Sequence, residues 1–131
     1  MGYRSTVAYT IRFEGDDDTK AKQSFYTFIA EAKSKETTAG AFTDEDLKVD
    51  EEKLAIYFFA GDVKWYEDYP DVRCHECLMG LAREWADENE CVGGAFARVG
   101  EEANDNIEEV WGNGDYDWVN IYRTMHCDWM D

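Results

Sequence analysis

The sequence has little positive charge: its 131 residues include 13 Lys and Arg against 30 Asp and Glu, which gives a formal net charge of -17. Nucleic acids and anionic lipid surfaces would both repel such a chain, so we expect no direct binding to either. Like charges on so small a body also weaken the compact state, and a net charge of about 2 to 8 is enough to keep a domain dispersed. The excess of carboxylates therefore favours a basic partner protein.

The chain also lacks long apolar runs and has a single proline, Pro70. No run of about 18 apolar residues occurs, so we predict no membrane span. The segment Met1–Val7 has no apolar signal-peptide core, and we expect a cytoplasmic protein with reduced cysteines. The composition is 15% aromatic and 44% hydrophobic, which disordered acidic chains do not match. The length fits one domain, expected to span residues 1–131.

Catalytic motifs are scarce. The only histidines are His75 and His126, and there is no P-loop, nucleophile elbow or H-E-x-x-H motif. Pairs of carboxylates could serve as general acid and base, as in glycosidases. With 30 carboxylates in the chain, however, such pairs are inevitable. We therefore predict that the protein is not an enzyme and needs no cofactor.

A small group of sulfur and imidazole ligands raises the question of a zinc site. Its members are Cys74, Cys77, His126 and Cys127. Zinc needs about four such ligands in tetrahedral geometry, but His126 and Cys127 are adjacent, so one backbone direction would have to serve both. Cys74 and Cys77 also fall in the apolar stripe of a predicted helix, where free cysteine commonly acts as a small hydrophobe. We therefore predict no dedicated metal site.

Hydrophobic periodicity predicts the element order β-α-β-β-α-β-β-β. The predicted strands cover Tyr3–Phe13, Leu47–Val49, Lys53–Gly61, Cys91–Glu101, Ile107–Trp111 and Tyr116–Met125, and the predicted helices end near Lys35 and Asn89, with a loop over Thr37–Thr43. Both faces of Lys53–Gly61 are apolar, which favours a central position in the sheet. Two helices would cover one face of a mostly antiparallel sheet. The sequence thus predicts a two-layer α+β domain, a variant of the ferredoxin-like fold.

The predicted last hairpin places aromatic and acidic residues on one face. Asn113-Gly114 favours a two-residue type I′ turn, which would pair Trp111 with Tyr116 and Glu109 with Trp118. We expect these four side chains, together with Tyr122, to point away from the helices and to form a binding surface. The alternative is that the aromatic pairs only stabilise the sheet.

The predicted alignment of the other strands has further consequences. Val110 would face the helix-covered core, and Tyr57 and Phe59 would join the outer face. A two-residue turn at Asn104-Asp105 would place Glu101 opposite Glu108, where like charges destabilise a sheet unless a basic partner or salt relieves them. A slip of one residue would exchange the two faces.

We therefore predict that partner binding involves the acidic and aromatic residues of this part of the chain. The predicted partner-binding residues are Glu101, Glu102, Asp105, Glu108, Glu109, Trp111, Asp115, Tyr116, Asp117 and Trp118. Further acidic clusters occur at Asp16–Asp18, Asp44–Asp46, Asp50–Glu52, Glu67–Asp68 and Asp87–Glu88. Carboxylates two apart on a strand or four apart on a helix are about 5 to 7 Å apart, the order of phosphate spacings, so the surface could mimic a nucleic acid. A halophilic origin would explain the charge without any partner.

The opening segment, Met1–Tyr9 with the sequence MGYRSTVAY, resembles the start of small uncharacterised proteins encoded by bacteriophages and prophages. The resemblance implies an accessory phage product, and small acidic phage proteins often look like inhibitors of host defence, including anti-CRISPR proteins and DNA mimics. We therefore predict a non-enzymatic inhibitor in the host cytoplasm that binds a basic, nucleic-acid-binding surface of a host protein. The alternative is a structural or assembly protein of the phage particle that self-associates through the outer sheet face.

Overall fold

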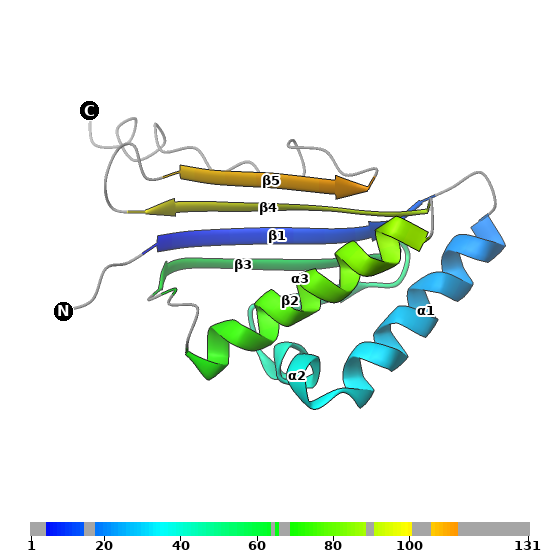
Figure 1. The fold of residues 1–131 in the computed structure, drawn as a ribbon, viewed down its shortest axis with the longest axis horizontal. Helices are drawn as coiled ribbons and strands as arrows, with labels where there is room; N and C mark the ends of the chain where they lie inside the picture. The colour runs from blue at the N-terminus through cyan, green and yellow to red at the C-terminus, as the bar shows by residue number, and fades with distance from the viewer. Residues whose placement is uncertain are drawn as a thin grey trace.

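The computed structural model describes residues 5–14, 18–63, 65, 69–88, 91–100 and 106–112 (Figure 1). Its elements are β1 (Ser5–Phe13), α1 (Asp18–Ser34), α2 (Glu36–Ala39), the 3-10 helix η1 (Gly40–Thr43), β2 (Leu47–Asp50), β3 (Ala55–Val63), α3 (Pro70–Glu88), β4 (Val92–Gly100) and β5 (Asn106–Gly112). The strands form one antiparallel sheet in the order β2-β3-β1-β4-β5, with the helices packed on one face. The predicted α+β class is confirmed. No helix in the described ranges is long and apolar enough to cross a membrane.

The middle strand of the sheet is β1, because it pairs with β3 on one side and β4 on the other. Its alternating side chains Val7, Tyr9, Ile11 and Phe13 are buried on the helix side. The strand predicted over Lys53–Gly61 is found as β3, which lies inside the sheet between β2 and β1. Period-2 patterning therefore located both strands, but it did not determine which one lies at the centre.

Each long helix crosses one strand of the sheet. The connection from β1 to β2 contains α1 and passes over β3, and the connection from β3 to β4 contains α3 and passes over β1. The buried stripe of α1 is Ala21, Phe25, Phe28 and Ala32, spaced three or four residues apart. Phe28 lies against Phe13 of β1, with ring centroids 5.4 Å apart. These contacts hold both helices on the same side of the sheet.

The loop predicted over Thr37–Thr43 is wrong, because this segment forms most of α2 and all of η1. With α2, the described residues contain three α-helices instead of the two predicted. Two threonine side chains stabilise these short turns. The Thr38 hydroxyl donates to the carbonyl of Ala32, and the Thr43 hydroxyl donates to the carbonyl of Gly40 at 2.7 Å. Side-chain bonds of this kind satisfy carbonyls at helix ends that have no partner within the helix.

The predicted register of β5 is also wrong. Ala97, four residues before Glu101, lies opposite Glu108, so the predicted pairing of Glu101 with Glu108 does not form. Glu109 lies opposite Phe96, which in turn lies opposite Tyr9, so its side chain is on the helix side of the sheet.

The side-chain faces of β5 are consequently exchanged. Trp111 packs against the main core, whereas Val110 packs on the outer face with Ala8, Ala95 and Ala97. Tyr57 and Phe59 lie on the outer face, as predicted, because they pair with Thr10 and Ala8 of β1. The predicted Asn113-Gly114 turn and the strand over Tyr116–Met125 lie outside the described residues.

The position of Trp111 depends on a glycine, which has no side chain, on the neighbouring strand. Trp111 lies opposite Gly94 of β4, and a Cβ added to Gly94 would be 2.2 Å from the indole ring. Such an approach is impossible for any residue except glycine unless the ring moves. Gly94 therefore creates the space that holds Trp111 on the helix side of the sheet.

We expect Gly94→Ala to lower the free energy of unfolding by about 1–3 kcal/mol, because the indole must move to accept the methyl group. The control is Gly80→Ala in α3, where an added Cβ meets nothing within 4 Å. This control should be neutral or up to about 1 kcal/mol more stable, since alanine favours a helix. Urea unfolding monitored by tryptophan fluorescence measures both. Wild-type stability in Gly94→Ala would contradict the packing described here.

Candidate functional site

An acidic cleft lies between α1 and α3. Its volume is about 410 Å³, and it is lined by Glu31, Leu81, Glu84, Trp85, Asp87 and Glu88. The α3 residues among them follow the spacing of neighbouring positions on a helix, so one face of α3 supplies most of the cleft. The Trp85 ring is held on its core side by the buried Phe28, since the two ring centroids are 5.5 Å apart. The result is four carboxylates around a rigid hydrophobic surface.

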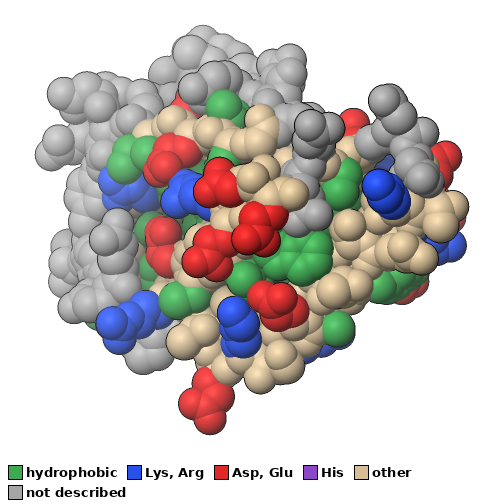
Figure 2. Space-filling model, turned by 45° about the vertical axis from the view of Figure 1, so that its right-hand side comes forward, with side chains coloured by type: hydrophobic (Ala, Val, Ile, Leu, Met, Phe, Trp, Pro, Cys, Tyr) green, Lys and Arg blue, Asp and Glu red, His purple; other side chains and the backbone are tan. Residues whose placement is uncertain are grey.

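The charge of this cleft is unbalanced. No Lys or Arg lines it, although Lys35 approaches Glu31 at 3.5 Å in an exposed pair. Asp87 and Glu88 lie in the last turn of α3, which has no basic residue. The carbonyl end of a helix is already negative and favours cations, so acids there cost helix stability. Figure 2 shows a face on which acidic side chains gather around hydrophobic atoms, with several Lys and Arg side chains beside them.

Three of the predicted partner-binding residues fall within the described ranges. Glu108 is exposed. The outward orientation predicted for Glu109 and Trp111 is wrong, because Arg83 of α3 contacts both: its Nη2 lies 2.7 Å from Glu109 Oε2, and its guanidinium carbon lies 4.7 Å from the centroid of the Trp111 ring. Arg83 thus neutralises one residue and covers the other.

The other predicted partner-binding residues lie outside the described ranges. They are Glu101, Glu102, Asp105, Asp115, Tyr116, Asp117 and Trp118. Sequence analysis identified Asp87–Glu88 as an acidic cluster but did not connect it with Glu31 or Glu84. The available signal was the four-residue spacing of Glu84 and Glu88 beside acids at a helix end.

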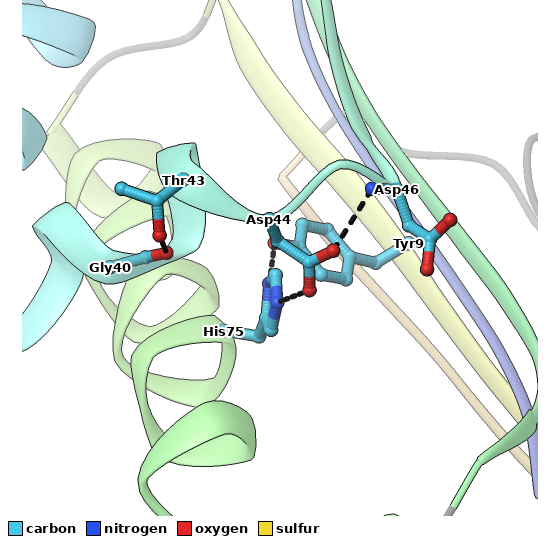
Figure 3. Close-up of polar contacts among 6 residues, drawn as sticks. All are labelled: Tyr9, Gly40, Thr43, Asp44, Asp46 and His75. Atoms are coloured by element: carbon cyan, nitrogen blue, oxygen red, sulfur yellow. Dashed lines mark hydrogen bonds and ion pairs between the residues drawn. The ribbon is translucent and has the colours of Figure 1, made fainter.

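A second feature is a chain of hydrogen bonds in the interior (Figure 3). The Tyr9 hydroxyl lies 2.6 Å from Nδ1 of His75, and Nε2 of His75 lies 2.9 Å from Oδ2 of Asp44. A carboxylate only accepts hydrogen bonds, so Nε2–H donates to Asp44. In a neutral imidazole protonated at Nε2, Nδ1 accepts a hydrogen bond from the Tyr9 hydroxyl. Each polar group of this chain therefore has a partner of the right kind.

The surroundings of His75 are almost wholly aromatic. The imidazole is 1% exposed, and its ring centroid lies 4.3 Å from that of Phe58 and 5.8 Å from that of Trp65. Burial raises the pKa of the Tyr9 phenol well above its usual value, and the nearby Cys74 and the Asp44 carboxylate raise it further. Tyr9 consequently remains a proton donor at neutral pH and cannot act as an accessible base.

This chain of bonds is structural. Tyr9 and His75 are buried, so neither can reach a substrate, whereas Asp44 lies at the surface end. The three residues belong to β1, to α3 and to the junction between η1 and β2. We name this set the Tyr9–His75–Asp44 chain. It fixes the position of α3 and of the η1–β2 junction relative to the centre of the sheet.

The described part of the chain contains no cluster of three His, Cys, Asp or Glu residues able to hold a metal ion. Cys74, Cys77 and Cys91 form no disulfide with one another. His126 and Cys127, the other residues weighed as zinc ligands, lie outside the described ranges.

No family model, curated protein or solved structure matches this chain. The resemblance of Met1–Tyr9 to phage proteins therefore stays a prediction. The function must be argued from the charges and the geometry of the described residues.

We expect Tyr9→Phe to lower the free energy of unfolding at pH 7 by about 1–3 kcal/mol, because Nδ1 of the buried imidazole loses its donor. Above pH 10, near the usual tyrosine pKa of about 10, the unfolded wild type releases the Tyr9 proton while the folded state keeps it. Wild-type stability therefore falls as the pH rises, and the difference from Tyr9→Phe narrows. Urea unfolding between pH 7 and pH 11 measures both effects.

The control for this variant is Tyr26→Phe. Tyr26 is 42% exposed, and its hydroxyl donates to Glu51 at 3.3 Å on the surface. Exposed substitutions of this kind change stability by less than about 0.5 kcal/mol. Equal stabilities of Tyr9→Phe and Tyr26→Phe would contradict the assigned hydrogen bond.

Proposed function

We propose that this chain is a non-enzymatic protein that binds a basic surface of another protein through the acidic cleft between α1 and α3. The observation that carries the proposal is the set of four carboxylates around Leu81 and Trp85, with no basic residue in the lining. Two of these acids lie at a helix end where they cost stability. A cost of this kind is explained if the acids bind cations.

The chemistry of the cleft suits lysine and arginine side chains. Their alkyl stems can pack on Leu81 and the Trp85 indole while the charged heads reach Glu84 or Glu88 at the rim. An indole face also attracts cations, most often the guanidinium of arginine. Binding of this kind is fast and weakens as salt is added.

The expected partner is a nucleic-acid-binding protein of a host cell. Glu84 and Glu88 are four residues apart on α3, which places their Cβ atoms about 5–6 Å apart, the order of phosphate spacings along a nucleic acid. Together with the phage-like opening segment, this spacing favours an inhibitor of the anti-CRISPR or anti-defence type that acts as a nucleic-acid mimic in the host cytoplasm.

The finer fold assignment belongs to the same proposal. The order β2-β3-β1-β4, with one helix crossing over β3 and another over β1, supports a ferredoxin-like variant to which β5 is added. This topology supports no particular function by itself.

A phage assembly protein is the second candidate, and one observation favours it. Phe59 is 59% exposed on the outer sheet face, where a second copy could cover it. The net charge of -17 on each copy opposes such self-association. Sizing chromatography separates the two functions, because an assembly protein forms oligomers.

We expect the wild-type chain to retain a basic protein from bacterial lysate at low salt and to release it as salt is raised. The double substitution Glu84→Lys with Asp87→Lys should reduce the retained amount at least about tenfold, because both carboxylates face the bound cations. The matched control, Glu36→Lys with Glu52→Lys, makes the same change of net charge at two exposed positions outside the cleft.

The outcomes distinguish binding at the cleft from attraction by the net charge of the chain. Loss in the cleft variant with retention in the control supports the proposal, and addition of a nucleic acid should then displace the retained protein. Equal loss in both variants would show that only net charge matters. Absence of any retained protein at low salt would overturn the proposed function.

A further inference from the structure

One long edge of β3 is only half covered. β2 pairs with Ala55–Phe58, whereas β3 continues to Val63 and pairs with β1 along its other side as far as that residue. Within the described ranges, no strand pairs with residues 59–63 on the β2 side. On that side, the second half of β3 is therefore a sheet edge, although the first half is paired with β2.

The pattern of hydrogen bonds shows which backbone groups this edge presents. Phe13 N–H donates to the carbonyl of Leu54 at 2.9 Å, next to the pair formed by Arg12 and Ala55. Hydrogen-bonded and non-hydrogen-bonded pairs alternate along an antiparallel ladder. Alternate residues of β3, up to Ala60, therefore bond to β1. Phe59 directs its N–H and C=O groups to the open side, and Gly61 directs its N–H there as well, because the carbonyl of Ala60 in the same peptide plane faces β1. The β1–β3 register shifts between Ala60 and Val63, directly after these groups. A further strand could pair with them.

Two observations show that this edge is accessible. Gly61 is exposed, and a Cβ added to it would meet no heavy atom within 4 Å. Phe59, two residues away, is 59% exposed and is the most exposed of the large hydrophobic residues in the described ranges. Unpaired main-chain groups beside an exposed aromatic side chain are the features that β-strand addition uses.

The Tyr9–His75–Asp44 chain explains why β2 does not cover this edge. Oδ2 of Asp44 is bound to His75 on α3, and Oδ1 accepts the backbone N–H of Asp46 at 2.9 Å (Figure 3). These two hydrogen bonds hold the polypeptide toward α3 until it enters the sheet at Leu47. A longer β2 would require Asp44 to leave the buried imidazole.

We propose that the edge at Phe59 and Gly61 binds an extended, basic segment of a partner protein as an added strand, in line with β2. The surroundings agree with a basic occupant, because Glu45 and Asp46 are exposed and directly precede the first paired residue of β2, while the exposed Lys48 directs its Nζ to the Glu45 carbonyl. A second copy of this chain would bring another net charge of -17 to the same edge and would be repelled. The inference relies on the proposed function only for the sign of the partner's charge, since this edge is separate from the cleft.

The test uses two peptides of equal charge and length with the full chain. One alternates Lys and Val and can form a strand, whereas the other alternates Lys and Pro and cannot donate to a ladder. We expect the Lys-Val peptide to slow amide hydrogen exchange at Phe59 and Gly61, measured by NMR. The Lys-Pro peptide should bind at least about tenfold more weakly and should protect neither amide.

Two variants test the edge itself. Gly61→Pro removes one donor and should weaken binding of the Lys-Val peptide at least about tenfold. Because this proline could also disturb β3, a second variant, Phe59→Lys, leaves the main chain intact and repels the basic peptide. Its matched control is Tyr26→Lys, which makes the same charge change at an exposed aromatic residue of α1. Phe59→Lys should weaken binding more than Tyr26→Lys.

Three results would overturn the inference: equal binding of the two peptides, equal loss in Phe59→Lys and Tyr26→Lys, or protection of Phe59 and Gly61 that rises with protein concentration without peptide. The last result would assign the edge to a second copy of the chain. The cleft is tested separately by Glu84→Lys with Asp87→Lys. If one of these three results is found and the cleft variant alone loses the lysate partner, the proposed function stays intact and only the added strand is removed.

Discussion

The hydrogen bonds of His75 are the constraint on which the rest of this structure depends. A buried imidazole without partners is costly, because its polar atoms lose water and gain nothing in return. Tyr9 and Asp44 supply those partners from β1 and from the η1–β2 junction, so three segments must meet at one point. Phe58 and Trp65 close the site around the ring. A polar group that can be satisfied in one arrangement thus selects that arrangement from the many that would bury the same apolar area.

The η1–β2 junction, which contains Asp44, links the core to the surface. Because Asp44 faces α3, β2 begins at Leu47, and within the described ranges residues 59–63 of β3 pair only with β1. On the helix side, the packing of Trp85 against Phe28 holds a hydrophobic surface between four carboxylates. The acids at the end of α3 oppose the helix dipole, and they are tolerated because the aromatic core beneath them supplies stability that the surface gives up. The stabilising aromatic core and the destabilising acidic surface are therefore two parts of one arrangement.

The sequence predicted the elements whose signal is local. The apolar alternation of Val7 to Phe13 located β1, and the three- and four-residue spacing of Ala21, Phe25 and Phe28 located α1. α2 and η1 were missed, because four residues are too few to show a helical period and the hydroxyl of Thr38 stabilises the turn instead. The face of β5 was predicted wrongly, since a strand of alternating residues fits either face until its register is known. Packing of Trp111 over Gly94 and under Arg83 decides that register, and neither contact is local in sequence. For the same reason nothing indicated the Tyr9–His75–Asp44 chain, whose bonds join residues 66 and 31 positions apart.

The tautomer of His75 tests this account most directly. Two-bond ¹H–¹⁵N correlation NMR at neutral pH distinguishes a ring protonated at Nε2 from one protonated at Nδ1, and His126, the only other histidine, provides a second signal in the same spectrum. The account requires His75 to be a neutral imidazole with its proton on Nε2, and Tyr9→Phe should shift its Nδ1 resonance as the hydrogen bond is lost. A proton on Nδ1 at neutral pH, or a His75 signal that titrates like a solvent-exposed imidazole, would contradict it.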